Sequence, residues 1–334
     1  MRRLISINNL LNQRALQGHM LMHYLKTLKN ETTMEPKEMA NLNHSVEVLS
    51  VATKTPIWHI EDLFEEQPHC SSKPFLLVLV ASAPENFERR NAIRKTWAGS
   101  ERQKHWITRT HAKTVFLIGL STTKFLNVLT QNENEQYGDV LLGSYVDTYR
   151  NLTAKVMHGF TWAFKQCKPM FLLKTDDDCF VNLHLLTEFL RKYNPIRTNL
   201  YAGRIRWSAP VIRDPTSRWY VSDKEYRGSR YAPYVSGAGY VMSLDVLHKL
   251  VQLSGKVDVF PNEDAYVGYV LNFARVRPTY SARFVTHNGP WQVCNFLYLF
   301  VVHHVKPSRQ KEFQDMVDLA RQKCPESDVA RDWV

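Results

Sequence analysis

Three adjacent carboxylates, Asp176, Asp177 and Asp178, come directly after a short apolar run in the middle of the chain. Adjacent carboxylates repel one another, and burial makes that repulsion more costly. Because side chains alternate along an extended segment, we expect Asp176 and Asp178 to point one way and Asp177 the other. Two carboxylates aimed into one cleft favour a divalent cation. The alternative is that they only cap a helix beginning near Leu183, although Asn182 is already placed for that purpose.

A second acidic pair, Glu263 and Asp264, opens another predicted helix. Acidic side chains in a first helical turn interact favourably with the helix dipole, so capping alone would explain them. The functional alternative is a catalytic base at the helix N-terminus. Upstream lies the glycine-rich segment YVSGAGYVMS (234–243). There, Gly237 and Gly239 either let the backbone approach a ligand closely or serve a tight turn.

Histidine and basic residues supply further candidates. His303 follows an apolar, strand-like run in LFVVHHVKP. Its ring therefore either points into a cleft or is a hydrogen-bonded structural residue. Arg90, Arg94 and Trp97 lie at positions i, i+4 and i+7 of a helix predicted over residues 85–99, so they share one face of it.

The elements that must hold these residues alternate between strand and helix. Continuous apolar runs predict strands buried on both faces of a sheet, and amphipathic patterns predict helices between them and a closing helix over 307–323. This alternation predicts an α/β fold with a mostly parallel sheet. In such sheets ligands bind beyond the carboxyl ends of the strands, where residues 176–178 lie. The predicted strands are FLLVLVASA (75–83), TVFLIGL (114–120), DVLLGSY (139–145) and MFLLK (170–174).

The net charge of +11 is distributed unevenly along the 334 residues. Residues 1–73 contain eight basic and eight acidic side chains, so the whole excess lies in residues 74–334. There the basic residues are dispersed, with no run of five or more. A nucleic-acid-binding groove, as in a metal-dependent nuclease, would need them concentrated. Dispersed charge favours an anionic small molecule as the ligand, and nucleic acid is not an expected partner.

Cysteine and asparagine patterns bear on the cellular compartment. Five cysteines without a Cys-x-x-Cys pair argue against a structural zinc site. They fit either one or two disulfides plus a free thiol, or five buried thiols. Sequons at Asn30, Asn43 and Asn151 hint at a secretory route. The first 30 residues contain no 18-residue apolar run and no signal-peptide core, so no membrane anchor is visible.

Four segments together resemble glycosyltransferase family 31, the beta-1,3-glycosyltransferases, and within it most the beta-1,3-galactosyltransferases. The segments occur in the order ERRNAIRKTW (88–97), FLLKTDDDCFVN (171–182), APYVSGAGYVMS (232–243) and NEDAYVG (262–268). The segments RDPTSRWYVS (213–222) and NLT (151–153) also match the galactosyltransferase subgroup. Any one of these motifs is weak, but four in one order are specific, and the resemblance covers about residues 75–324.

The resemblance implies a fold and a domain organisation. The expected fold is the GT-A type, in which a Rossmann-like, mostly parallel sheet flanked by helices binds the donor and is fused to an acceptor-binding half. Residues 30–73 are polar, mixed and aperiodic, so we expect an N-terminal stem or linker without a clear transmembrane helix over residues 1–73, followed by a catalytic domain over 74–326 and a C-terminal tail over 327–334.

The resemblance also assigns roles around a UDP-sugar and Mn²⁺. It implies that Asp178 and His303, rather than His304, bind the metal. It implies further that Asp176 contacts the ribose or the water shell of the metal, and that Asp177 belongs to the same cofactor-binding motif.

Two further assignments come from the same source. Arg90, Arg94 and Trp97 match a family segment beside the nucleotide. Asp264, the second acid of its motif, matches the catalytic base.

The implied activity is inverting, metal-dependent transfer of a hexose, most simply galactose, from a UDP-sugar. The acceptor is the 3-hydroxyl of a sugar on a glycoprotein or glycolipid, and the product has a beta-1,3 linkage. The alternatives are transfer of an N-acetylhexosamine (GlcNAc or GalNAc) by the same mechanism, or an inactive sugar-binding module. A module without activity should have lost Asp178 or Asp264, and both are present. The family further implies association with the Golgi membrane and a lumenal catalytic domain.

Overall fold

A computed structural model of the chain describes residues 68–99 and 112–334. These residues all belong to one compact unit, Pro56–Val334. Most of the predicted stem, including the sequons at Asn30 and Asn43, lies outside the described residues. Within the part that is described, no helix combines the length and apolar character needed to cross a bilayer.

A seven-stranded mixed sheet forms the centre of the unit, in the order β3-β2-β1-β4-β7-β6-β8. The four strands predicted from apolar runs pair in parallel, whereas β7 is antiparallel to both β4 and β6. The α/β prediction with a mostly parallel sheet is therefore confirmed. The strands are β1 (Leu76–Ala81), β2 (Ala112–Leu120), β3 (Val140–Val146), β4 (Phe171–Asp176), β6 (Tyr201–Arg206), β7 (Tyr234–Ser243) and β8 (Thr279–Tyr280).

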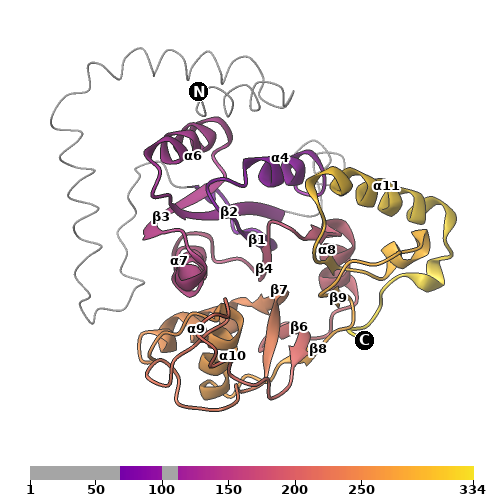
Figure 1. Ribbon diagram of the computed structural model, residues 1–334. Helices are drawn as coiled ribbons and strands as arrows, with labels where there is room; N and C mark the ends of the chain where they lie inside the picture. The colour runs from indigo at the N-terminus through magenta and orange to yellow at the C-terminus, as the bar shows by residue number, and fades with distance from the viewer. Residues whose placement is uncertain (1–67, 100–111) are drawn as a thin grey trace, which may run out of the picture. The chain divides into compact units, whose positions relative to one another are not determined.

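Helices cover both faces of this sheet (Figure 1). Val78 of β1 belongs to a core cluster that includes residues of α4, α8 and α11, and its neighbour Leu79 belongs to a second cluster with residues of α7, α9 and α10. Burial on both faces explains why β1 is apolar throughout. The helices are α4 (Phe87–Lys95), α6 (Lys124–Tyr137), α7 (Leu152–Trp162), α8 (Leu183–Lys192), α9 (Leu244–Ser254), α10 (Glu263–Phe273) and α11 (Pro307–Lys323).

The glycine-rich segment 234–243 is strand β7 and not a tight turn. Its glycines lie where other elements come close. A Cβ atom on Gly239 would lie 3.1 Å from Cγ1 of Val301, and one on Gly237 would lie 3.3 Å from Oε2 of Glu263. The turn alternative is therefore wrong, and the missing side chains make room for neighbouring elements.

A small second sheet brings the segment containing His303 to the end of β4. Its order is β5 (Phe180–Val181), β10 (Val301–Val302) and β9 (Phe284–Val285). The backbone N–H of His303 donates to the Val285 carbonyl at 3.0 Å, and that of Val305 donates to the Asp178 carbonyl at 2.8 Å. These bonds place the strand-end histidine beside the acidic motif.

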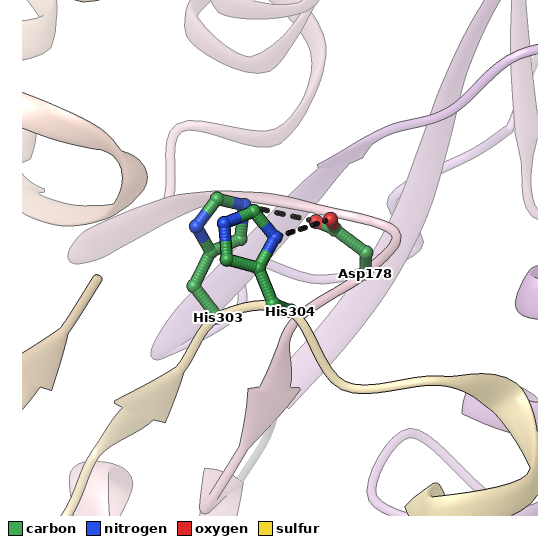
Figure 2. Close-up of side chains that lie close together, drawn as sticks. All are labelled: Asp178, His303 and His304. Carbon is green, nitrogen blue, oxygen red and sulfur yellow. Dashed lines mark ion pairs between the residues drawn. The ribbon is translucent and has the colours of Figure 1, made fainter. Parts of the chain in front are cut away.

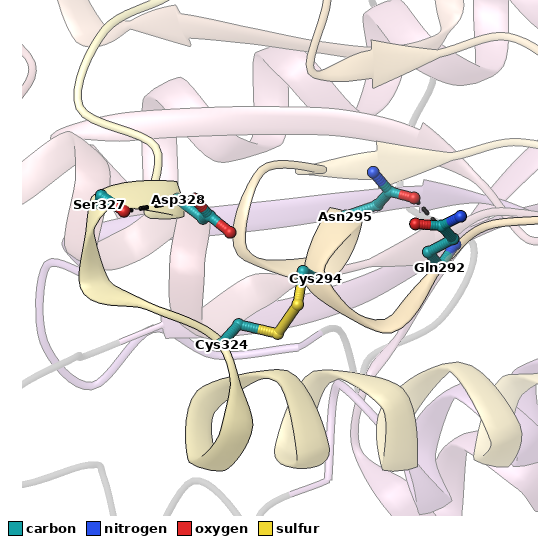
Figure 3. The surroundings of a disulfide bond; sticks show 6 residues. All are labelled: Gln292, Cys294, Asn295, Cys324, Ser327 and Asp328. Atoms are coloured by element: carbon teal, nitrogen blue, oxygen red, sulfur yellow. Dashed lines mark hydrogen bonds between the residues drawn. A yellow bond between two sulfur atoms is a disulfide. The ribbon is translucent and has the colours of Figure 1, made fainter.

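Four of the five cysteines form disulfides. Cys294, in a 3₁₀ turn, is bonded to Cys324 at the end of α11 (Figure 3). Cys70 is bonded to Cys167, which ends the π-helical turn that continues α7. Cys179 is free and buried. The prediction of disulfides with a free thiol is confirmed over that of five buried thiols.

Described residues on the far side of both predicted domain boundaries are bonded to the catalytic unit, and the boundaries themselves stay predictions. The stem was expected to run to residue 73, but its Cys70 is covalently tied to the catalytic unit. The predicted tail 327–334 also packs into that unit: the Trp333 ring is buried, and its Nε1–H donates to Asn194 at 3.1 Å. Asp332 forms an ion pair of 2.6 Å with Arg283. A disulfide and a buried tryptophan thus attach Cys70 and the segment 327–334 to the catalytic unit.

Candidate active site

The three adjacent carboxylates do not alternate as expected, because β4 ends at Asp176 and the next two residues form a turn. The prediction that Asp176 and Asp178 point the same way assumed an extended segment, and that assumption is wrong. Each carboxylate has partners of its own. The carboxylate of Asp176 accepts a hydrogen bond from Lys174, that of Asp177 is bonded to the β1–α4 segment, and that of Asp178 faces two histidines.

Asp177 is held firmly inside the protein. Its carboxylate accepts hydrogen bonds from Ser82 Oγ at 2.7 Å, Asn86 Nδ2 at 2.8 Å and Arg89 Nη1 at 3.1 Å. Burial raises the pKa of Asp177, and the bonds from Ser82 and Asn86 oppose that rise. These bonds tie the end of β4 to the start of α4. The oxygens of Asp177 thus already have partners inside the protein. The assignment of Asp177 to cofactor binding stays a prediction.

The Asp178 carboxylate faces the stacked rings of His303 and His304 (Figure 2). The distances are 3.2 Å from His303 Nε2 to Oδ1 and 3.4 Å from His304 Nδ1 to Oδ2. Burial alone would raise the pKa of Asp178, but the hydrogen bond and charge of His303 lower it. Burial alone would lower the pKa of His303, and Asp178 raises it. The carboxylate oxygen suits Mn²⁺ and the imidazole nitrogen suits other divalent transition metals, so this mixed donor set can hold the implied Mn²⁺.

The arginines predicted beside the nucleotide are paired inside the protein. The buried Arg90 side chain donates to both carboxylate oxygens of Glu133, at 2.8 and 2.6 Å. Arg94 donates to both oxygens of Asp139, at 2.8 and 2.6 Å, and forms an ion pair with Glu133 at 2.7 Å. Trp97 is buried in the core. The shared helix face is therefore not a free cationic surface, and contact of these three residues with nucleotide stays a prediction.

Arg89 is a basic residue of the site that the sequence analysis missed. Its side chain is 39% exposed, and its Nη1 lies 3.1 Å from Asp177 Oδ1 and 3.9 Å from Asp178 Oδ2. The signal was present as the first arginine of the doublet in ERRNAIRKTW, but the helical spacing drew attention to Arg90 and Arg94.

Lys174 is a second missed residue. Its fully buried ammonium donates to Asp176 Oδ1 at 2.9 Å and to the Gly237 carbonyl at 2.8 Å, and it lies 3.0 Å from Glu263 Oε2. Burial alone would lower the pKa of Lys174, but Asp176 and Glu263 outweigh that effect and raise it. A lysine inside an otherwise apolar strand is unusual, and that signal could have found it.

Glu263 and Asp264 begin α10 but face different surroundings. The buried Glu263 accepts a hydrogen bond from the Tyr240 hydroxyl, and burial raises its pKa to about 7 despite the opposing charge of Lys174. Asp264 is only half-buried. Its carboxylate accepts hydrogen bonds from the backbone N–H of Gly237 at 2.9 Å and of Ala265 at 2.8 Å. Asp264 is therefore oriented by the backbone while remaining accessible to a ligand.

Aromatic side chains border this end of α10. Asn262, the residue before the helix, donates from Nδ2 to the Trp219 carbonyl at 3.5 Å. Trp219 and Tyr149 are exposed, and the Arg218 guanidinium lies 4.8 and 5.2 Å from their ring centroids. The pKa of Tyr149 is raised to about 12, first by burial and then by the negative charge of Asp264. The segment RDPTSRWYVS thus lies close to the proposed base.

Comparison with known proteins identifies the family of this chain. Residues 88–281 match the family model described as Galactosyltransferase. The chain is similar to beta-1,3-galactosyltransferase 5 of Homo sapiens, with 34% identity over 261 residues that cover 75% of this chain and 81% of that protein. It is also similar to beta-1,3-galactosyltransferase 1 of Mus musculus, with 30% identity over 268 residues that cover 79% and 81%.

Among solved structures, the galactosyltransferase LgtC in complex with donor and acceptor sugar analogues aligns over 75% of this chain and 98% of that one, at 12% identity and a TM-score of 0.34. That likeness is too distant to add to the assignment. The match to the family model over more than half of the chain, together with the two relatives, is sufficient: this chain belongs to the galactosyltransferase family of beta-1,3-galactosyltransferase-like hexosyltransferases, glycosyltransferase family 31.

Proposed function

We propose that the protein transfers galactose from a UDP-sugar to the 3-hydroxyl of an acceptor sugar on a glycoprotein or glycolipid, with inversion at the anomeric carbon. Family membership and the names of its relatives support the sugar and the linkage. The observation that carries the mechanism is the pairing of a metal-type donor set at Asp178 with a backbone-oriented, half-buried carboxylate at Asp264. Transfer of an N-acetylhexosamine by the same residues is the second candidate.

Asp178 and His303 would hold the divalent cation. When bound there, Mn²⁺ supplies Lewis-acid stabilisation of the charge that develops on the departing diphosphate. The half-exposed guanidinium of Arg89, beside Asp178, is placed to assist at the same oxygens. Arg90 and Arg94 both pair with Glu133 of α6, so these bonds hold α4 against α6.

Asp264 would act as the general base. As the acceptor oxygen bonds to the anomeric carbon, the bond from that carbon to the UDP oxygen breaks, and the hydroxyl proton passes to the Asp264 carboxylate. The base must then work on the face opposite the leaving group, as it does in inverting glycosidases. The two backbone N–H donors on Asp264 fix its orientation and favour its ionised form.

The Lys174 ammonium links the two halves of this site. It contacts Asp176, which precedes the proposed metal ligand, and Glu263, which precedes the proposed base. Its positive charge offsets some of the repulsion among these carboxylates. We therefore assign Lys174 a positioning role and Glu263 a structural one.

The exposed rings of Trp219 and Tyr149 would receive the acceptor sugar. Aromatic side chains supply an apolar face for ligand contact, and these two lie at the end of α10 that carries Asp264. The two disulfides suit an oxidising compartment, which supports the lumen of the Golgi as the site of action. Membrane association is proposed from the family alone.

A donor screen tests the proposed function. The full chain is incubated with Mn²⁺, a panel of UDP-sugars and a soluble sugar acceptor, and transfer products are analysed for linkage. We expect UDP-galactose to give a beta-1,3-linked product, and loss of that product on chelation of the metal. Exclusive use of a UDP-N-acetylhexosamine would establish the second candidate, and no turnover with any donor would contradict both.

A further inference from the structure

The side chain of His304, next to the predicted metal ligand His303, also faces Asp178. Its Nδ1 lies 3.4 Å from Asp178 Oδ2, and the two imidazole rings are stacked with centroids 3.8 Å apart (Figure 2). One ligand atom from each of the three residues lies within 4.8 Å of the others. Both histidines therefore have the same target, although the family pattern singles out only the first.

The backbone of His304 adopts a costly conformation to achieve this. Its φ of +60° lies in the left-handed region, which costs non-glycine residues about 1–3 kcal/mol, although histidine, like asparagine and aspartate, adopts it more readily than most. Neighbouring bonds hold the segment there: Val305 N–H donates to the Asp178 carbonyl at 2.8 Å, and Asn288 Nδ2 donates to the His304 carbonyl at 3.3 Å. Such strain is concentrated at functional sites.

Ion pairing with Asp178 does not account for this conformation. The His304 side chain is 63% exposed. An ion pair in such a position stabilises a protein by only about 0–1 kcal/mol. The exposed ion pair therefore stabilises this arrangement only weakly, whereas a cation shared by the three side chains would stabilise it more strongly.

We propose that Asp178, His303 and His304 bind the divalent cation together, as a two-histidine, one-carboxylate set that leaves the remaining coordination positions to diphosphate oxygens and water. The location of the cation rests on the proposed function, but the third ligand goes beyond it. Imidazole nitrogen favours metals late in the first transition series, whereas Mn²⁺ binds most weakly in that order and prefers oxygen ligands. A second imidazole should therefore increase the preference for Co²⁺ over Mn²⁺.

The variant His304→Asn tests the third ligand, because asparagine tolerates a left-handed backbone and removes the imidazole. Co²⁺ and Mn²⁺ are titrated separately into the full chain without UDP-sugar by calorimetry, and the visible absorption of bound Co²⁺ is recorded. We expect Co²⁺ affinity to fall by more than about tenfold, since even loss of an outer-sphere partner costs about 10–100-fold. Mn²⁺ affinity should fall less, and the Co²⁺ spectrum should change.

Two control variants separate the possible outcomes. His287→Asn is the matched control, because this exposed histidine lies outside the three-residue set, and it should leave both affinities unchanged. Unaltered Co²⁺ affinity and spectrum in His304→Asn, with both lost in His303→Asn, would overturn the third ligand and leave the proposed metal site standing. If His303→Asn and Asp178→Asn also bound Co²⁺ normally, the metal site of the proposed function would be overturned with it.

Discussion

Three adjacent carboxylates coexist in this protein because the chain turns between them. Asp176 is neutralised by the buried Lys174, and Asp177 receives three hydrogen bonds from Ser82, Asn86 and Arg89. Only Asp178 faces the histidines. The repulsion among the three carboxylates is thus relieved by separate partners, and Asp178 is the one that faces imidazole nitrogens.

The variant Asp264→Asn should cut turnover by about 10²–10⁴-fold, which is what a general base typically contributes. The amide keeps the shape of the side chain but cannot take the acceptor proton. UDP-sugar affinity should stay near that of the wild type, because the donor-side residues are untouched. Turnover and donor affinity are measured by product formation and calorimetry. Glu263→Gln is the paired control: it should lower stability more than turnover, and the reverse order of severity would assign the base to Glu263.

The variant Lys174→Met should move the acidic limb of the pH–turnover profile to higher pH. Asp264 must be ionised to act, so activity is lost as the pH falls through its pKa. Burial raises the pKa of Asp264 and the charge of Lys174 lowers it, so removing that charge raises it further. The profile is measured at saturating donor. Lys155→Met removes another buried lysine, paired with Asp147 at 2.6 Å, and should lower stability without moving the limb.

The two neighbours Arg89 and Arg90 should respond differently to alanine substitution. Arg90→Ala leaves the buried Glu133 with one arginine fewer, and breaking a buried pair of this kind costs about 3–5 kcal/mol of unfolding free energy. Arg89→Ala should change stability little and raise the KM for the donor. Denaturant unfolding and donor kinetics measure the two effects, and an unaltered donor KM in Arg89→Ala would remove this residue from the diphosphate site.

At the scale of elements, the site depends on how closely α10 approaches β7. The Gly237 carbonyl accepts a hydrogen bond from the Lys174 ammonium, and the Gly237 N–H donates one to the Asp264 carboxylate. A single residue of β7 therefore connects the buried cation to the proposed base. One turn further along α10, a Cβ atom on Gly268 would lie 2.3 Å from Cβ of Tyr234. The helix can therefore pack here only without a side chain.

The variant Gly268→Ala should destabilise the protein and reduce turnover, although alanine favours a helix over glycine by about 1 kcal/mol. The added methyl group also meets the Tyr234 Cα at 2.8 Å, so the start of the strand or the helix must move. Overpacking of this kind costs about 1–3 kcal/mol. Thermal unfolding and turnover are the measurements. Gly289→Ala, whose Cβ meets only Trp291 at 3.8 Å, should be neutral in both, and equal behaviour of the two variants would contradict the close approach.

At the scale of the whole molecule, the catalytic unit is closed by covalent bonds near both ends. The Cys70–Cys167 bond spans 97 residues and the Cys294–Cys324 bond spans 30. Together with the buried Trp333, they attach residues on the far side of the predicted boundaries at 73 and 326 to this unit. A truncated chain that starts after Cys70 would lose one of these bonds.

Replacing Cys70 and Cys167 together by serine should lower the unfolding free energy by about 2–5 kcal/mol, the usual effect of removing a native disulfide. The loss arises mainly because the unfolded chain is no longer constrained. Denaturant unfolding of the full chain under oxidising conditions measures it. Reduction of the wild type should remove the part of its extra stability that comes from the Cys70–Cys167 bond. Equal stability of the variant and the oxidised wild type would show that the bond does not form. Turnover at low temperature should survive, since neither cysteine lies at the site.

The sequence by itself determined the elements whose signals are local. Strands β1 to β4 and helix α11 follow from apolar periodicity, and Asn182 caps α8 as expected, accepting a hydrogen bond from Leu185 N–H. Periodicity and capping depend on neighbours within a few residues, so the sequence records them directly. The family motifs likewise named the acidic residues and the strand-end histidine in order.

Only the tertiary structure decided which of these groups meet. Arg90 is bound by Glu133, 43 positions along the chain, and Lys174 meets Gly237, 63 positions away. The turn after Asp176 and the left-handed backbone at His304 direct Asp178 and two imidazoles to one point. Local periodicity carries no record of such partners, because they are chosen by the register of non-adjacent strands and by the burial of charge in a common core. That is why the residue types of the site could be predicted from the sequence, while their pairing could not.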